Sequence, residues 1–568
     1  MTFAFYDLET TGISPAFDQP LQFAAILTDD AFREIERINL RCRIAPHIIP
    51  SPWALAITGV RPAQLLDPAL PTLFEFTQEI GALIARWSPA IWTGFNSIRF
   101  DEEMLRHAFY QNLQPDIFAT QFNGNTRFDV LTALYAVWHR QPDLFEWPVD
   151  ETGRVRFKLD RIAPLNGFTA HNAHDALGDV EATIHIARQI AQRGPELWSE
   201  LLANRDKGHV QASLATFQPM ALVERFGGGM PRATIGCFCG TSASNPNQAA
   251  FFDLDAADPA DLLTADDATI FAAVDATPKV IRFVTVNKSP ALLSVAAPSA
   301  EQLRRAEVIA NAPEFRARVG QALAERFPED PDAPTPPVEK QIYGGSYSNA
   351  DKALLAEFQR VDWPRRQEIV ATLSDPRLRQ LGRRLVAFNA PELLSREEDA
   401  QYRAWLEGRW LAADEPEPEW MTIEKSRRAL AEAQASGACD IELAAEIDAF
   451  LAELARAGMT PDWLPGVVPR CVPMETKNNQ HGERATTIVV GTERVKTRGK
   501  WRTVDVLACP VTWRPHPDQI ASARHGYEDW WRALDWVRDG LLAGHMLREV
   551  EVTAAMPKVR PWLAFSRK

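Results

Sequence analysis

Two acidic residues follow an apolar run at the start of the chain, in the sequence FAFYDLETTG. Asp7 and Glu9 are two positions apart, so on a strand their side chains share one face, about 7 Å apart at Cα. Acids held this close repel each other, and a cluster of further carboxylates would make sense mainly as a cation site. Taken alone, the pair is equally typical of a strand end that carries solvated acids.

Two more acids lie between an apolar segment and a helix. Asp101 follows a predicted strand in GFNSIRFDEEML, and Asp179 begins a predicted helix in HNAHDALGDVEATIHIARQ, with Val180, Ile184 and Ala187 on its inner face. Asp101 alone could equally be a helix N-terminal acid that the macrodipole stabilises. If the four carboxylates converge, their oxygen ligands suit Mg²⁺ or Mn²⁺ rather than zinc.

A histidine precedes the fourth acid. His174 is five residues before Asp179, and on one continuous helix the two would lie about 140° apart. They converge only if His174 lies on the loop that enters the helix, with a bend at Gly178. His171 and His185 are interpreted as structural or surface residues. His174 differs from them only because it would lie near the candidate carboxylates.

The elements that must position these residues form an α/β pattern up to about residue 195. The predicted strands are Phe3–Leu8, Leu21–Leu27 and Ala90–Phe95, and the predicted helices include Phe74–Ala85 and Asp179–Gln192. Each candidate acid therefore lies at or near the end of a strand or the start of a helix.

The rest of the chain changes character three times. From about 196 to 345, short apolar runs separated by Gly-rich turns predict a small, mostly β domain, and PEDPDAPTPPVEK at 328–340 predicts an extended linker. From about 346 to 465, apolar residues at helical spacing predict a helical domain. The segment 466–568 predicts a further α+β unit, with a hairpin around Arg498-Gly499 and a helix from about Pro517 to Trp536.

Composition indicates an ordered, multidomain protein: of the 568 residues 46% are apolar and 24% charged. The N-terminus does not resemble a secretory signal and no long apolar run occurs, so we expect a cytoplasmic protein without a membrane partner. The six cysteines lack paired spacing, which favours neither disulfides nor zinc, and Cys237 and Cys239 are interpreted as buried thiols.

The formal charge of -14 is unevenly distributed, because residues 468–568 contain 17 Lys and Arg against 11 Asp and Glu. In RVKTRGKWR the cations recur at every second position, which would place up to five of them on one face of a hairpin. Such a face is equally typical of an edge strand protected from aggregation and of a nucleic-acid or partner surface. The tryptophans of this segment are interpreted mainly as core residues.

The motifs together resemble a known family. DLET, NSIRFD and the HxxxxD pattern from His174 to Asp179, in this order and at this spacing, resemble the DEDDh exonucleases of the RNase H-like superfamily, and within them the family of bacterial exonuclease I. The similarity continues weakly through VNKSPALL and QIYGGSYSNADKALL to about residue 465. We therefore predict a multidomain α/β protein with an RNase H-like exonuclease domain at 1–195 and an SH3-like, mostly β domain at 196–345. An α-helical domain at 346–465 and an unrecognised basic α+β appendage at 466–568 follow.

The resemblance implies the roles of the candidate residues. Asp7 would bridge two Mg²⁺ ions, with Mn²⁺ as the alternative; Glu9 and Asp179 would complete the first site, and Asp101 would serve the second. His174 would accept a proton from the attacking water, which a neutral imidazole near pH 7 can do. The reaction would release 5′-mononucleotides from the 3′ end of single-stranded DNA in repair or recombination.

The resemblance also implies the contacts of the strand. Glu9 and the basic residues Arg106, Lys158, Lys207 and Lys288 lie at positions where the family faces the DNA, although each basic residue alone is more typical of a solvated surface charge. Lys158 stands where the family has Arg. Single-stranded DNA-binding protein is a further partner that the family implies, and we expect a monomer.

Two other functions remain open at this point. An RNA-trimming or proofreading member of the same superfamily would use the same carboxylates, although the compact members lack the β and helical additions. A catalytically inactive module that only holds DNA or a partner would bind metal without turnover.

Overall fold

The computed structural model describes most of the chain, in two compact units. The described residues are 1–169, 175–275, 277–326, 333–412 and 417–457, and four short strands between 488 and 565. Met1–Arg383 and Asp414–Asp448 form the first unit, and Arg384–Ala413 and Ala449–Lys568 form the second. Within the described residues, no helix is long and apolar enough to cross a membrane.

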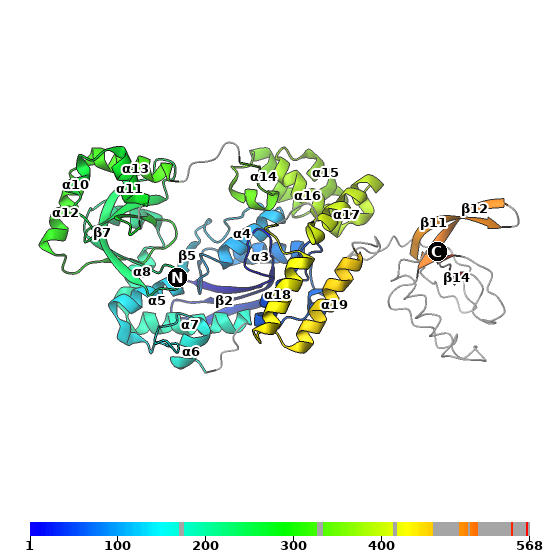
Figure 1. Ribbon diagram of the computed structural model, residues 1–568, viewed down its shortest axis with the longest axis horizontal. Coiled ribbons are helices and arrows are strands. Elements are labelled where there is room, and N and C mark those ends of the chain that lie inside the picture. The colour runs from blue at the N-terminus through cyan, green and yellow to red at the C-terminus, as the bar shows by residue number, and fades with distance from the viewer. Residues whose placement is uncertain are drawn as a thin grey trace. The chain divides into compact units, whose positions relative to one another are not determined.

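The N-terminal part of the first unit is built on a mixed sheet of five strands (Figure 1). In spatial order these are β3 (Glu34–Arg41), β2 (Pro20–Thr28), β1 (Phe3–Thr10), β4 (Ile91–Gly94) and β5 (Thr126–Asp129). The first three pair antiparallel, whereas β1, β4 and β5 run parallel. The α/β prediction for this part of the chain is confirmed.

Alternation along β1 divides the core into two layers. Phe3 and Phe5 pack with α5 (Val130–Arg140) and α7 (Ala176–Arg193) on one face. Ala4, Tyr6 and Leu8 pack on the other face with α3 (Leu73–Trp87) and α4 (Asp101–Gln111). Each large apolar side chain buried in this way contributes about 2 kcal/mol. Asp7 and Glu9 continue the odd-numbered series, so they emerge on the face that α7 covers.

The helices begin where the sequence supplies caps. Thr72 and Glu75 form a reciprocal capping box at the start of α3, and Asp129 accepts hydrogen bonds from the first backbone N–H groups of α5. The shorter elements of this part are α1 (Pro52–Thr58), α2 (Pro62–Leu65), η1 (Pro142–Leu144) and α6 (Leu159–Leu165).

A second sheet follows, entirely antiparallel. Its strands in spatial order are β10 (Leu292–Ser294), β6 (Met220–Glu224), β7 (Arg232–Thr241), β8 (Gln248–Asp253) and β9 (Ile281–Thr285). The helices around it are α8 (Pro195–Ala203), α9 (Lys207–Leu214), α10 (Ala260–Leu263), α11 (Asp267–Asp275), α12 (Ala300–Ala310) and α13 (Pro313–Glu325). The segment is therefore α+β rather than mostly β, because Phe315, Val319 and Leu323 bury one face of α13 in this core.

The end of the predicted linker is ordered as well. Val338–Tyr343 forms the 3₁₀ helix η2 with Val338 and Ile342 buried, and the Tyr110 hydroxyl donates to the Val338 carbonyl at 2.8 Å. The expectation of an extended linker is wrong from Val338 onward, because the side chains of Val338 and Ile342 are buried and the backbone forms a 3₁₀ helix. Residues 327–332 lie outside the described part of the chain.

The described residues from 349 to 457 are mainly helical, and they are divided between the two compact units. The helices are α14 (Asn349–Phe358), α15 (Trp363–Thr372), α16 (Pro376–Asn389), η3 (Pro391–Leu393), α17 (Arg396–Leu411), α18 (Ile423–Ala435) and α19 (Ile441–Ala457). In the first unit, Arg61 forms an ion pair of 2.9 Å with Glu446 of α19. In the second, the Arg384 guanidinium lies 4.2 Å from the ring centroid of Trp405 in α17.

In the C-terminal hairpin, β11 (Ile488–Thr497) pairs antiparallel with β12 (Lys500–Ala508), so that Lys496 is opposite Trp501 and Val495 is opposite Arg502. The side chains of the predicted cationic face lie outside the described part of the structure. Two short strands, β13 (Leu547–Arg548) and β14 (Ala564–Phe565), complete the description, and the helix predicted from Pro517 to Trp536 lies outside it.

Candidate metal centre

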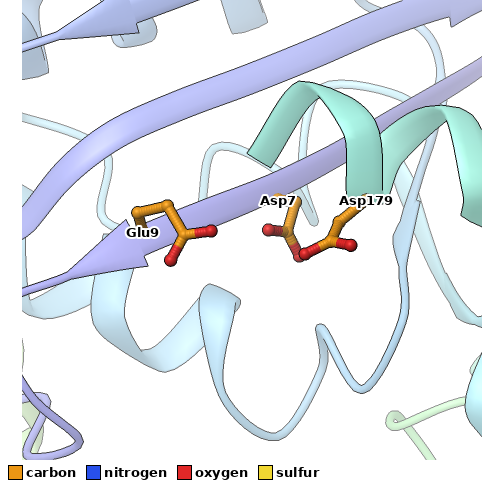
Figure 2. Close-up of side chains that lie close together, drawn as sticks. All are labelled: Asp7, Glu9 and Asp179. Atoms are coloured by element: carbon orange, nitrogen blue, oxygen red, sulfur yellow. The ribbon is translucent and has the colours of Figure 1, made fainter. Parts of the chain in front are cut away.

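Three carboxylates converge on the face of β1 that α7 covers. Asp7 and Glu9 extend from β1, and Asp179 comes from the first turn of α7 (Figure 2). One ligand oxygen from each of the three lies within 4.8 Å of the others. The packing of Val180, Ile184 and Ala187 against the sheet core holds the helix at this distance, as the sequence predicted.

The fourth predicted carboxylate approaches from the opposite layer. Asp101 is the first residue of α4 and is 3% exposed. Its Oδ1 accepts a hydrogen bond of 3.2 Å from the Leu8 backbone N–H. Leu8 lies between Asp7 and Glu9, so Asp101 is placed beside the three-carboxylate cluster without belonging to it. Its negative charge contributes to raising the pKa of Asp7.

Burial and mutual repulsion shape the electrostatics of these four acids. Burial first, and then the neighbouring carboxylates, raise the pKa of Asp7 well above its usual range and that of Glu9 to about 8. Burial also raises the pKa of Asp101 to about 8, although its backbone hydrogen bonds oppose this shift. A pair of unit charges at such separations repels by about 3 kcal/mol at an effective dielectric of 20. A divalent cation would remove this penalty, and a set made only of carboxylate oxygens fits Mg²⁺ or Mn²⁺.

Asp129 is a buried acid beside this centre that the sequence analysis did not single out. Its carboxylate accepts from the backbone N–H groups of Asn96 at 3.1 Å and Ile98 at 3.2 Å, and also caps α5. Residues 95–100 connect β4 to Asp101, so Asp129 holds the loop that delivers the fourth carboxylate. A signal was available in TRFDVL, where an acid stands between a predicted strand and a helix, the setting in which Asp101 was singled out.

The predicted base, His174, lies outside the described residues together with His171. Helix α7 begins at Ala176 and includes Gly178. The ring of His185 is bonded to the Asn166 carbonyl at 2.9 Å, which agrees with its interpretation as structural. His185 is therefore not assigned to the carboxylate cluster.

The four basic residues expected to face a strand differ in their surroundings. Lys158 and Lys288 are exposed, and the Lys288 ammonium is 3.7 Å from a Glu103 oxygen. Lys207 is half-buried and donates to the Asn247 side chain at 2.7 Å. The side chain of Arg106 is only 7% exposed and is bonded to Glu102 and Gln121, so its charge is already compensated inside the protein.

The buried thiols expected at two positions of β7 are present. Cys237 and Cys239 are free and fully buried, and burial raises the pKa of both above the usual range. Both residues pack in the core of the second sheet. These cysteines are therefore structural.

Two family models match the chain. A model described as exonuclease matches residues 4–187, and a model described as exonuclease I C-terminal domain matches residues 336–454. Together the two ranges make up just over half of the chain. The first range contains all four carboxylates and His174.

Individual proteins are similar over most of their length. Exodeoxyribonuclease I of Escherichia coli K12 is 29% identical over 431 residues, which cover 72% of this chain and 89% of the relative. The crystal structure of E. coli exonuclease I in complex with a dA16 oligonucleotide matches with a TM-score of 0.68 and 29% identity, covering 80% of this chain and 99% of that one. A crystal structure of SSB/exonuclease I in complex with the inhibitor CFAM matches with a TM-score of 0.67 and 27% identity, again over 80% and 99% of the two chains.

Proposed function

Because the chain belongs to the family of bacterial exonuclease I, we propose that it is a metal-dependent exonuclease that degrades single-stranded DNA from the 3′ end to 5′-mononucleotides. The process that it serves would be DNA repair or recombination. The observation that carries the proposal is the convergence of Asp7, Glu9 and Asp179 within 4.8 Å, with Asp101 beside them.

The carboxylates take the roles that the resemblance implies. Asp7, Glu9 and Asp179 would hold one Mg²⁺ ion, and Asp7 and Asp101 would hold a second. When bound, such ions would supply a water of lowered pKa and positive charge for the entering and leaving oxygens of the phosphodiester. The grouping supports this division, because the three residues of the first site are those whose oxygens lie together.

The protein groups themselves orient the reaction. The Leu8 N–H fixes one oxygen of Asp101, which leaves its other oxygen for a cation, and the core behind β1 and α7 keeps the cluster rigid. His174 accepts the proton of the attacking water, as a neutral imidazole can near pH 7.

The strand would reach this centre along basic groups of the helices and loops that adjoin the two sheets. Lys158, Lys207 and Lys288 supply sequence-independent phosphate contacts. Glu9 contacts the terminal nucleotide. The SH3-like antiparallel sheet lies along one side of the bound strand. The buried Arg106 supports this path through its neighbours rather than by direct contact. Single-stranded DNA-binding protein is proposed as a partner and the monomer as the working state; the similar structure that contains SSB supports the former.

A digestion assay tests the proposal. A 5′-labelled single-stranded DNA oligonucleotide with Mg²⁺ should shorten stepwise from its 3′ end and release mononucleotides, and an RNA of the same sequence should remain largely intact. Asp179→Asn should abolish shortening, whereas the exposed control Glu307→Gln on α12 should not change it. Preferential digestion of RNA would favour an RNA-trimming enzyme, and metal binding without any digestion would favour an inactive binding module.

A further inference from the structure

The residue after Asp101 is a buried acid with two arginine partners. Glu102 lies in the first turn of α4, and its side chain is 2% exposed. Its Oε1 accepts from Arg106 of the same helix and, at 2.6 Å, from Arg127 of β5. Both arginine side chains are almost fully buried, so the three charges lie close together and away from water.

The two arginines extend this network to other segments. Arg127 also donates to the backbone carbonyl of Asn287, in the connection between β9 and β10 of the second sheet. Arg106 donates to the Gln121 side chain at 3.0 Å, and its guanidinium lies 4.8 Å from the ring centroid of Phe118. The position of α4 is therefore set by β5, by the 112–125 connection and by the second sheet together.

The next residue, Glu103, contacts the same two outer segments. The Tyr343 hydroxyl of η2 donates to Glu103 at 2.5 Å, and Lys288, which follows Asn287, approaches it at 3.7 Å. The first turn of α4 thus presents Asp101 to β1, Glu102 to the buried arginines and Glu103 to the second sheet and η2. All of these residues belong to the first compact unit.

The charges make this arrangement stiff. A buried carboxylate that loses one arginine partner leaves an uncompensated charge in a low-dielectric interior, which is strongly unfavourable. A shift of α4 along its axis would break the bond between Glu102 and Arg127, whereas Arg106 would move with the helix that carries both residues. Because the Asp101 carboxylate is one residue away from Glu102, its distance from Asp7 is fixed by the same bond to Arg127.

We propose that Glu102 is a positioning residue of the metal centre, which through Arg127 ties the Asp101 carboxylate to the Asn287–Lys288 segment of the second sheet. The inference rests on the proposed function, and it adds a residue that binds neither cation nor strand. The buried network of Glu102, Arg106 and Arg127 then serves to hold the Asp101 carboxylate where a cation would bind. A network that only stabilised the fold could be altered without changing the affinity for the cation.

The test compares Glu102→Gln and Arg127→Lys with Asp351→Asn in the full-length protein. Asp351 is a matched control, because it is a 1% exposed acid in the first turn of α14 that accepts bonds from Ser374, outside the proposed site. Mn²⁺ binding is titrated by electron paramagnetic resonance without DNA. The Kd for oligo(dT) is measured in EDTA, and kcat and KM are measured in Mg²⁺.

We expect Glu102→Gln to weaken Mn²⁺ binding at least fivefold and to lower kcat at least tenfold, with the oligo(dT) Kd changed less than twofold. Arg127→Lys should act in the same direction, and Asp351→Asn should lower the melting temperature without changing Mn²⁺ binding. Unchanged Mn²⁺ binding and kcat in Glu102→Gln would overturn the inference, as would a change confined to KM and the oligo(dT) Kd. If the wild-type protein binds Mn²⁺ but digests nothing, the proposed function fails, while the Mn²⁺ titration still decides the role of Glu102.

Discussion

Removing one negative charge from the carboxylate cluster should stabilise the metal-free protein while it destroys activity. Glu9→Gln keeps the size of the side chain and removes its charge. Glu9 is 9% exposed and its pKa is raised to about 8, so its ionised form is disfavoured in the folded state. The substitution therefore separates what the cluster does for folding from what it does for a cation.

The magnitude follows from two estimates. The shift of the pKa of Glu9 from 4.5 to about 8 corresponds to about 5 kcal/mol at about 1.4 kcal/mol per pH unit. Repulsion from one neighbouring charge within the cluster accounts for about 3 kcal/mol at a dielectric of 20. Taking the smaller figure and about 2 °C per kcal/mol for a large domain, Glu9→Gln should melt about 6 °C above the wild type at pH 8 in EDTA.

The change of this stability difference with pH follows from the protonation of Glu9 in the folded and unfolded states. A carboxyl whose pKa is raised on folding is neutral in both states below the unfolded value of 4.5, and the wild type loses stability as the pH rises from there to about 8. The difference between Glu9→Gln and the wild type should therefore nearly vanish at pH 5. Saturating Mg²⁺ should reverse it at pH 8, because the wild type gains binding free energy that the variant lacks.

Differential scanning calorimetry at pH 5 and 8, with EDTA or Mg²⁺, measures all four conditions, and Glu307→Gln serves as the exposed control. Nuclease activity of Glu9→Gln should fall at least 100-fold. The reasoning would be refuted if Glu9→Gln melted at or below the wild type at pH 8 in EDTA, or if Mg²⁺ raised the melting temperature of both proteins equally.

Three further predictions concern the same centre and its surroundings. The Mg²⁺ concentration that gives half-maximal activity should fall at least tenfold from pH 6 to pH 8, because Glu9 and Asp101, with pKa values of about 8, must lose protons to hold a cation; a pH-independent requirement in steady-state assays would contradict this. Asp129→Ala should destabilise the protein by about 1–2 kcal/mol, because the cap of α5 is lost. It should also lower kcat about tenfold, because the loop before Asp101 is released. If denaturant unfolding shows the loss of stability but kcat is unchanged, Asp129 acts on folding alone. A chain that ends at residue 465 should keep its specific activity within twofold, because neither family match extends past residue 454, and a large loss in the digestion assay would assign the appendage a part in catalysis.

The elements of the N-terminal domain were predictable because their apolar patterns are long and regular. The odd and even residues of β1 divide between two buried layers, and this alternation alone places Asp7 and Glu9 on one face. Asp101 begins a helix in the structure as predicted, and Asp179 lies in the first turn of a helix that begins three residues earlier, at Ala176. The family resemblance then supplied what spacing alone left open, namely that these acids act together.

Long-range pairing was not predictable from local pattern. The burial of Arg106 depends on Glu102 and Arg127, which is 21 positions further along the chain, and a basic residue in a sequence that binds DNA is more readily interpreted as a surface contact. The pairing of the C-terminal hairpin depends on its register, which places Lys496 opposite Trp501 and Val495 opposite Arg502. In both cases the outcome is decided by partners in space rather than by neighbours in sequence.

Anomalous diffraction from crystals soaked in Mn²⁺ tests directly whether Asp7, Glu9, Asp179 and Asp101 form a centre for divalent cations. We expect a manganese peak bounded by Asp7, Glu9 and Asp179, which is lost in Asp7→Asn crystals. Manganese bound only elsewhere, or no peak among these carboxylates at a saturating Mn²⁺ concentration, would contradict it.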